Sequence, residues 1–119
     1  MKDYGLRDRT KAFALRTVKM YCRLPKTTEA QVLGKQALRA GTSVAANYRE
    51  ASRGRSDAEL ISKLGIVEQE LDETLLWLEL LVESGIVPVA KMAALQKEAD
   101  ELLRMTIAAI KTAKRRRQD

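Results

Sequence analysis

The longest amphipathic segment of the sequence is residues 56–84, which read SDAELISKLGIVEQELDETLLWLELLVES. Apolar side chains recur in it every three or four residues, the period of one face of an α-helix. They are Leu60, Leu64, Val67, Leu71, Leu75, Leu78 and Val82, flanked by Ile61, Trp77 and Leu81. Ser56, followed three residues later by Glu59, has the form of a capping box. The segment therefore predicts one long helix, near 57–84, with one buried face.

Turn-forming residues divide the rest of the chain into three more helical segments. Pro25 ends the first, because proline cannot continue the helical hydrogen-bond ladder. Thr28 with Gln31 repeats the capping-box spacing and starts the second segment. Gly85 and Pro88 separate the third segment from the fourth. We expect helices near 7–24, 28–51, 57–84 and 88–114.

The composition favours an all-α protein. Two prolines, six glycines and 4% aromatic residues are too few turn and strand formers for a sandwich or a barrel. Short connections between four helices favour an antiparallel up-down-up-down four-helix bundle, formed as a single domain over residues 1–119. The second segment is rich in small residues such as Gly34, Ala37 and Gly41, which predicts close approach of a neighbouring helix.

The chain contains no histidine and a single cysteine, Cys22. Histidine-dependent nucleophile systems and zinc sites of histidine and cysteine are therefore excluded. Glu70 and Glu73 share a helix face, but di-iron bundles depend on Glu-x-x-His pairs, so we expect no metal, no cofactor and no enzymatic activity. One cysteine forms no internal disulfide, and no apolar run reaches the roughly 18 to 20 residues of a membrane span. These features favour a cytoplasmic protein without a membrane partner.

Several motifs of the second and third segments are those of a known family. They are GKQALRAGTSVAAN at 34–47, REA at 49–51, Ser56 with Glu59, ELDET at 70–74 and WLELL at 77–81. Together they resemble the bacterial S23 family, also called the 23S rRNA-intervening sequence proteins, over residues 7 to 114. The chain departs from it at Ala51, where many members have glycine, and at Tyr48, where many have an apolar residue.

The resemblance implies an antiparallel four-helix bundle that assembles into a ring-like homo-oligomer, with pentamers known in the family. It carries no assigned enzymatic activity. It also implies a relation to the basic accessory protein of diversity-generating retroelements, a pentameric bundle held to contact nucleic acid and a reverse transcriptase. The expected partners are therefore other copies of this chain, with the pentamer favoured, and RNA, DNA or a partner protein.

Charge is distributed unevenly along the chain. Lys and Arg number 22 against 16 Asp and Glu, a net charge of +6. Residues 57–88 contain one basic and eight acidic side chains, whereas the segments on both sides are basic. We expect the acidic third helix to pair with a basic neighbour, within the bundle or across a subunit boundary. A solvated acidic face explains the same pattern.

A basic run begins where the apolar pattern of the fourth segment fades, in the tail at 111–119. It consists of Lys111, Lys114, Arg115, Arg116 and Arg117. The run is a candidate phosphate-binding arm, mobile beyond the helix, that an oligomer would repeat around a ring. Cations that offset the dipole of a helix C-terminus provide a structural explanation. The scarcity of aromatic residues argues against sequence-specific readout by base stacking.

A second polar group lies at the junction of the second and third helices. Its members are Asn47, Glu50, Arg53, Arg55 and Ser56. A binding site is one interpretation; the favoured one is structural, with Ser56 capping a helix and Asn47 and Glu50 satisfying buried donors or helix-end amides. Glu59 and Glu73 are likewise assigned structural or interface roles. Tyr4, Tyr21, Tyr48, Trp77 and Met92 are expected at core or subunit contacts, and Cys22 in a buried or half-buried position.

Overall fold

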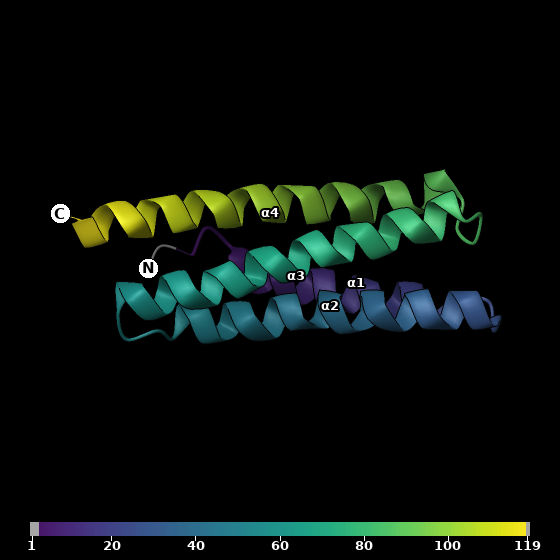
Figure 1. Ribbon diagram of the computed structural model, residues 1–119, viewed down its shortest axis with the longest axis horizontal. Coiled ribbons are helices and arrows are strands. Elements are labelled where there is room, and N and C mark those ends of the chain that lie inside the picture. The colour runs from purple at the N-terminus through teal and green to yellow at the C-terminus, as the bar shows by residue number, and fades with distance from the viewer. Residues whose placement is uncertain (1–2, 119) are drawn as a thin grey trace.

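The chain folds into four helices that run alternately up and down as an antiparallel bundle (Figure 1). The computed structural model describes residues 3–118. The helices are α1 (Leu6–Cys22), α2 (Thr28–Ser52), α3 (Asp57–Glu83) and α4 (Val89–Gln118). The bundle measures 52 × 20 × 19 Å. The prediction of an all-α, up-down-up-down four-helix bundle is confirmed.

The helices pack around the bundle in chain order. α2 packs against α1 and α3, and α3 packs against α4, whereas α1 and α4 contact each other only sparsely. A buried core runs along the bundle axis, and the apolar stripe predicted for α3 supplies Leu64, Val67, Leu71 and Leu78 to it, each 0% exposed. The weak α1–α4 contact leaves this side of the bundle the least closed.

Close approach of α1 to α2 depends on two glycines. A Cβ atom on Gly41 would lie 2.6 Å from the Thr17 Cγ2 atom, and one on Gly34 would lie 3.0 Å from the Tyr21 Cδ1 atom. Such distances leave no room for a side chain, so the helices touch through glycine backbone. The predicted role of the small residues in α2 is confirmed.

Two helix boundaries are formed by the predicted residues. The Ser56 hydroxyl accepts a hydrogen bond from the Glu59 N–H at 3.2 Å, and the Glu59 carboxylate accepts one from the Arg55 N–H at 2.6 Å. This is the predicted capping box with one difference: the Glu59 carboxylate accepts from the N–H of Arg55, the residue before the cap, instead of from the N–H of Ser56. Gly85, directly after the last residues of α3, has a φ of +80°, a left-handed conformation that glycine adopts without strain.

The predicted start of the second helix at residue 28 is confirmed, but its predicted capping residue is wrong by one position. Thr27, not Thr28, is the N-cap, and its hydroxyl accepts a backbone N–H of the first turn at 3.3 Å. Gln31 returns no bond to this cap. Its amide donates to the Pro25 carbonyl oxygen at 2.9 Å and accepts from the Tyr21 hydroxyl at 2.8 Å. Gln31 therefore ties the turn before α2 to the end of α1.

The fourth helix is longer than predicted. It continues through Gln118 instead of ending near residue 114, so the basic run is helical and the prediction of a mobile arm is wrong for 111–118. The alanine-rich sequence and its basic residues favour helix beyond the last apolar contact. Asp119, the end of the predicted tail, lies outside the described residues.

Most of the aromatic and methionine side chains expected in the core are there. Those that lie in the core or pack against it are Tyr21, Tyr48, Trp77 and Met92. Tyr4 is 67% exposed, so of its two predicted locations the core is wrong and a subunit contact stays a prediction; Cys22 is exposed rather than buried or half-buried. Tyr4 lies just before α1, the shortest helix, and Cys22 is its last residue.

Candidate nucleic-acid interface

The two polar groups of the sequence lie at the same end of the bundle. The C-terminus of α2, the connection to α3 and the C-terminus of α4 are neighbours there (Figure 1). The guanidinium of Arg116, in the last turn of α4, donates to the Asp57 carboxylate at 2.8 Å, in the first turn of α3. One ion pair thus joins the basic run to the α2–α3 junction, and the two form a single surface.

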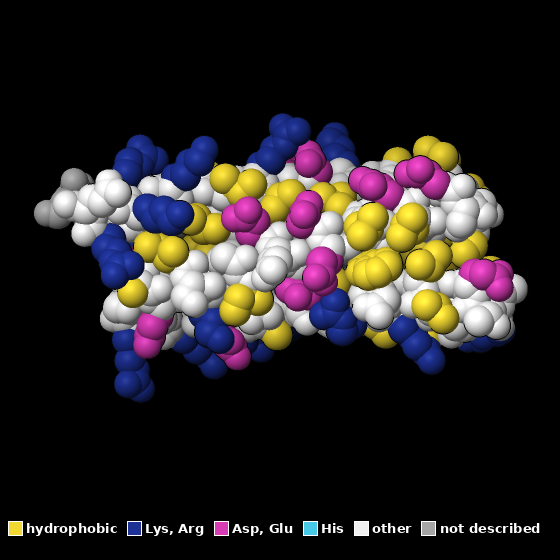
Figure 2. Space-filling model, in the orientation of Figure 1, with side chains coloured by type: hydrophobic (Ala, Val, Ile, Leu, Met, Phe, Trp, Pro, Cys, Tyr) yellow, Lys and Arg dark blue, Asp and Glu magenta, His cyan; other side chains and the backbone are white. Residues whose placement is uncertain are grey.

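We call this surface the basic end and define it as residues 49–57 and 111–118. It contains eight Lys or Arg residues and two acidic ones, a net charge of +6. This equals the net charge of the whole chain, so the remaining residues sum to zero. Dark blue side chains crowd this end of the bundle in Figure 2, whereas acidic and hydrophobic side chains are more frequent toward the other end.

Few of these cations are neutralised within the protein. Arg116 pairs with Asp57, and Glu50 pairs with Lys63 at 2.7 Å on the neighbouring turn of α3. Seven other basic side chains of this surface form no ion pair with any described residue: Arg49, Arg53, Arg55, Lys111, Lys114, Arg115 and Arg117. All seven are exposed. They present unpaired positive charge to solvent, as phosphate-binding surfaces do.

The connection itself is shaped as a shallow polar hollow. It has a volume of about 320 Å³ and is lined in part by Ser52, Arg55, Ser56 and Asp57, with Arg116 closing one side. The Arg55 backbone is held by the Glu59 carboxylate, so the loop conformation is set by the cap of α3. Cations on both walls make the hollow suited to a phosphate group.

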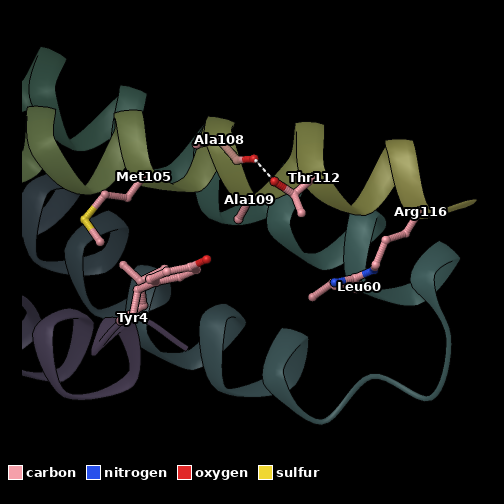
Figure 3. A pocket seen from close by; sticks show the side chains of 8 residues that line it. Tyr4, Leu60, Met105, Ala108, Ala109, Thr112 and Arg116 are labelled. Atoms are coloured by element: carbon pink, nitrogen blue, oxygen red, sulfur yellow. Dashed lines mark hydrogen bonds between the residues drawn. The ribbon is translucent and has the colours of Figure 1, made fainter. Parts of the chain in front are cut away.

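An apolar hollow adjoins the basic end where α1 and α4 separate (Figure 3). Its volume is about 290 Å³. The lining residues are Tyr4, Leu6, Leu60, Met105, Ala108, Ala109, Thr112 and Arg116. Arg116 therefore borders both hollows. The Thr112 hydroxyl turns away to the Ala108 carbonyl oxygen at 3.1 Å, which leaves mainly carbon surface on the α4 wall.

The segment before α1 holds Tyr4 beside this hollow. The Asp3 carboxylate accepts a hydrogen bond from the Arg7 N–H at 3.2 Å and another from the Tyr48 hydroxyl. Tyr4 and Gly5 follow with φ values of 54° and 76°, two consecutive left-handed residues. Sequence reasoning missed Tyr4 as a site residue. The signal that was present is the Tyr4-Gly5 pair, since glycine often accompanies a left-handed turn.

The remaining predicted site residues have structural contacts. The Asn47 side chain donates to the Ser43 carbonyl oxygen at 2.9 Å within α2, and Glu50 is exposed and paired with Lys63. The hypothesis that Asn47 and Glu50 satisfy helix-end amides is therefore wrong. The Trp77 indole nitrogen is buried and has no hydrogen-bond partner among the described residues.

The acidic third helix pairs with a basic neighbour inside the bundle. Arg39 of α2 lies 2.9 Å from Glu73 and 3.3 Å from Glu70 of α3. The bond to Glu73 is the main cause of a raised pKa of the Arg39 guanidinium, and the charge of Glu70 adds to it. The prediction of pairing within the bundle is confirmed for this position.

Residues 3–118 contain neither a candidate metal-binding cluster nor a candidate membrane-spanning helix. No group of three or more cysteine, aspartate or glutamate side chains lies close enough together to hold a metal ion. None of the helices in this range combines the length and the apolar character that crossing a membrane requires.

Comparison with known proteins gives a family but no activity. The chain matches the 23S rRNA-intervening sequence protein family over residues 2–108. It is similar to the crystal structure of a protein with unknown function from the S23 ribosomal protein family of Bacteroides thetaiotaomicron VPI-5482. That chain is 37% identical with a TM-score of 0.86, and the match covers 93% of this chain and 99% of the other. No protein with a curated description matches.

Proposed function

The chain belongs to the 23S rRNA-intervening sequence protein family, and from that premise we propose that it is a non-enzymatic protein whose basic end binds nucleic acid. The absence of histidine supports binding rather than catalysis. The cytoplasmic location favoured by its single cysteine stays a prediction, and it is compatible with such a partner. The family match stops at residue 108, before the basic run, so the proposal rests on this chain's own surface.

The observation that carries the proposal is the location of the charge. The entire net charge of +6 resides at the basic end, where seven cations have no acidic partner among the described residues. A cation that neutralises a phosphate releases a condensed counterion, so a cluster of unpaired cations gains free energy on a phosphate backbone. Cations already paired inside the protein would contribute less.

A four-residue substitution tests this assignment. Replacing Arg53, Lys111, Lys114 and Arg117 by Ala removes four of the seven unpaired cations. The slope of log K against log salt for a single-stranded oligonucleotide should fall by about 3, at roughly 0.7 for each phosphate contact. The matched control replaces four exposed cations toward the other end, namely Lys19, Arg23, Lys26 and Lys35. Equal losses in both variants, or no binding by the wild type at about 50 mM salt, would overturn the proposal.

Self-association is the second candidate function, and the outer faces of α1 and α3 favour it. Leu15 and Val18 are 53% and 38% exposed on α1 beside basic side chains, and Leu76 and Leu80 are 46% and 38% exposed on α3 beside acidic ones. The two helices are not neighbours around the bundle, since each packs against α2. Docking of one face onto the complementary face of the next copy is a head-to-tail contact, which closes into a ring or grows as a filament.

The resemblance favours five copies, and a ring would repeat the basic end and raise its avidity. Light scattering should then give five times the chain mass of 13.3 kDa. Leu76→Lys should shift the protein to a smaller species, whereas the same change at Val32, 58% exposed on α2, should not. A monomeric wild type would rule this candidate out. If the variant without the four cations still captures a partner after nuclease treatment, this result would instead favour a protein-docking scaffold.

A further inference from the structure

The apolar hollow beside the basic end arises from the way α1 and α4 diverge. Beside the hollow, α1 contributes only its first residue, Leu6, and α4 contributes the small side chains of Ala108 and Ala109. Neither helix fills the space between them. At about 290 Å³ the hollow lies near the lower limit of the roughly 300 to 1,000 Å³ of ligand pockets. This size suits one flat ring system and is too small for a segment of protein chain.

The lining of the hollow combines two kinds of contact. Leu6, Leu60 and Met105 provide carbon and sulfur surface, and the Tyr4 ring provides an aromatic face that is largely open to solvent. Arg116 reaches the same space from α4 (Figure 3). Its side chain is 46% exposed, and the bond to Asp57 fixes the guanidinium while leaving other N–H groups to donate. An aromatic surface and an oriented cation that line the same hollow are two groups that bind a nucleobase and its phosphate.

The backbone keeps Tyr4 in place. A non-glycine residue with a φ of 54° is in a left-handed conformation that costs on the order of 1 kcal/mol or more. It persists because Asp3, directly before it, is bonded to both α1 and Tyr48. The backbone of Tyr4 is therefore already in place beside the hollow, so less backbone freedom is lost when a ligand stacks on its exposed ring.

We propose that the hollow receives one unpaired base, stacked on Tyr4, while Arg116 contacts the adjoining phosphate. This inference rests on the proposed function and names its substrate as single-stranded nucleic acid. The base must be unpaired because a base inside a duplex is stacked on both faces and cannot reach a pocket. The stacking contact carries no base identity, since every base has an aromatic face. The stacking contact therefore distinguishes a single strand from a duplex but does not distinguish one base sequence from another.

The experiment compares three probes: a 12-nucleotide single-stranded RNA, the same sequence as single-stranded DNA, and the corresponding duplex. Wild-type protein should prefer both single strands to the duplex. Tyr4→Leu keeps an apolar side chain but removes the aromatic face, and should weaken single-strand binding roughly 5- to 150-fold, the range for one stacked base. Duplex binding should not change. Tyr4→Trp should restore single-strand binding.

Salt dependence separates this inference from the proposed function. Tyr4→Leu should lower affinity at every salt concentration while the slope of log K against log salt stays that of wild type, because no phosphate contact is lost. Ala109→Leu, which fills the hollow from α4, should weaken single-strand binding in the same way. Two results would overturn the stacked base alone: equal affinity of wild type and Tyr4→Leu for the single strands, or no preference of wild type for single strands over duplex. Failure of all three probes to bind would overturn the proposed function as well.

Discussion

The hydroxyl of Tyr48 donates a hydrogen bond of 2.5 Å to the carboxylate of Asp3. Tyr48 is 1% exposed and belongs to the core of α2, whereas Asp3 precedes α1 and also accepts the Arg7 N–H. The bond therefore anchors the start of the chain to the interior of the bundle.

Tyr48→Phe should destabilise the protein by about 1 to 2 kcal/mol. The change removes a hydrogen bond to a charged group but keeps the ring in the core, and the partly exposed Asp3 carboxylate remains accessible to water. Urea unfolding followed by circular dichroism measures the loss. Tyr4→Phe is the matched control and should cost less than about 0.5 kcal/mol because that ring is exposed. If Tyr48→Phe unfolds at the same urea concentration as the wild type, the bond does not anchor the segment.

Stability should fall at alkaline pH through the same residue. Burial, and then the hydrogen bond to Asp3, raise the pKa of Tyr48 above its ordinary value of 10.0. Below pH 10 the phenol is protonated in both folded and unfolded chains, so the stabilisation is fully present. Above it the unfolded chain ionises first, and the free energy of unfolding drops by up to about 1.4 kcal/mol per pH unit. Unfolding midpoints from pH 9 to 11 should decline more steeply in wild type than in Tyr48→Phe; parallel curves would contradict the prediction.

The parts of the fold that were predictable depend on residues close together in the sequence. The α3 stripe, the Ser56–Glu59 cap and the left-handed Gly85 each follow from a spacing of a few residues. The end of α4 was misplaced because the apolar period fades near Ala113 while helix propensity and the Arg116–Asp57 bond continue the helix. Thr27 and Thr28 both carry a hydroxyl, and only the backbone conformation distinguishes them.

The candidate site was predictable in part. In an up-down-up-down bundle the C-termini of α2 and α4 lie at the same end, so the meeting of the basic run with the 49–57 junction follows from topology. The apolar hollow does not. It depends on the small α1–α4 contact and on the left-handed Tyr4, which are set by packing between segments about a hundred residues apart.

Gly41→Ala should destabilise the bundle although alanine is the better helix former. The added Cβ would lie 2.6 Å from the Thr17 Cγ2 atom, and overpacking of this kind costs typically about 1 to 3 kcal/mol, more than the gain of about 1 kcal/mol in propensity. Gly65→Ala in α3 is the matched control, because no atom lies within 4 Å of its Cβ position. Thermal unfolding should show a lower midpoint for the first variant and a higher one for the second. A rise in both would mean that α1 and α2 separate without cost.

Asp57→Asn should strengthen nucleic-acid binding while slightly weakening the fold. The change removes one of two acidic groups at the basic end and releases the Arg116 guanidinium from a 2.8 Å ion pair. With one more cation free for phosphate, the slope of log K against log salt should steepen by about 0.7 to 0.9. The loss of an acidic side chain from the first turn of α3 should cost about 0.3 to 1 kcal/mol.

Asp100→Asn is the matched control for this charge change. Asp100 pairs with Arg104 at 3.0 Å within α4, away from the basic end, so its removal alters the net charge equally but frees no cation near the proposed site. Oligonucleotide binding across a salt series distinguishes local from global electrostatics. If both variants steepen the slope alike, the gain reflects net charge alone. If Asp57→Asn leaves the slope unchanged while the four-alanine variant lowers it, phosphate binds the other cations and the Arg116 contact is wrong. A gain confined to Asp57→Asn is the result expected if the Asp57 charge offsets the charge that Arg116 presents to a phosphate.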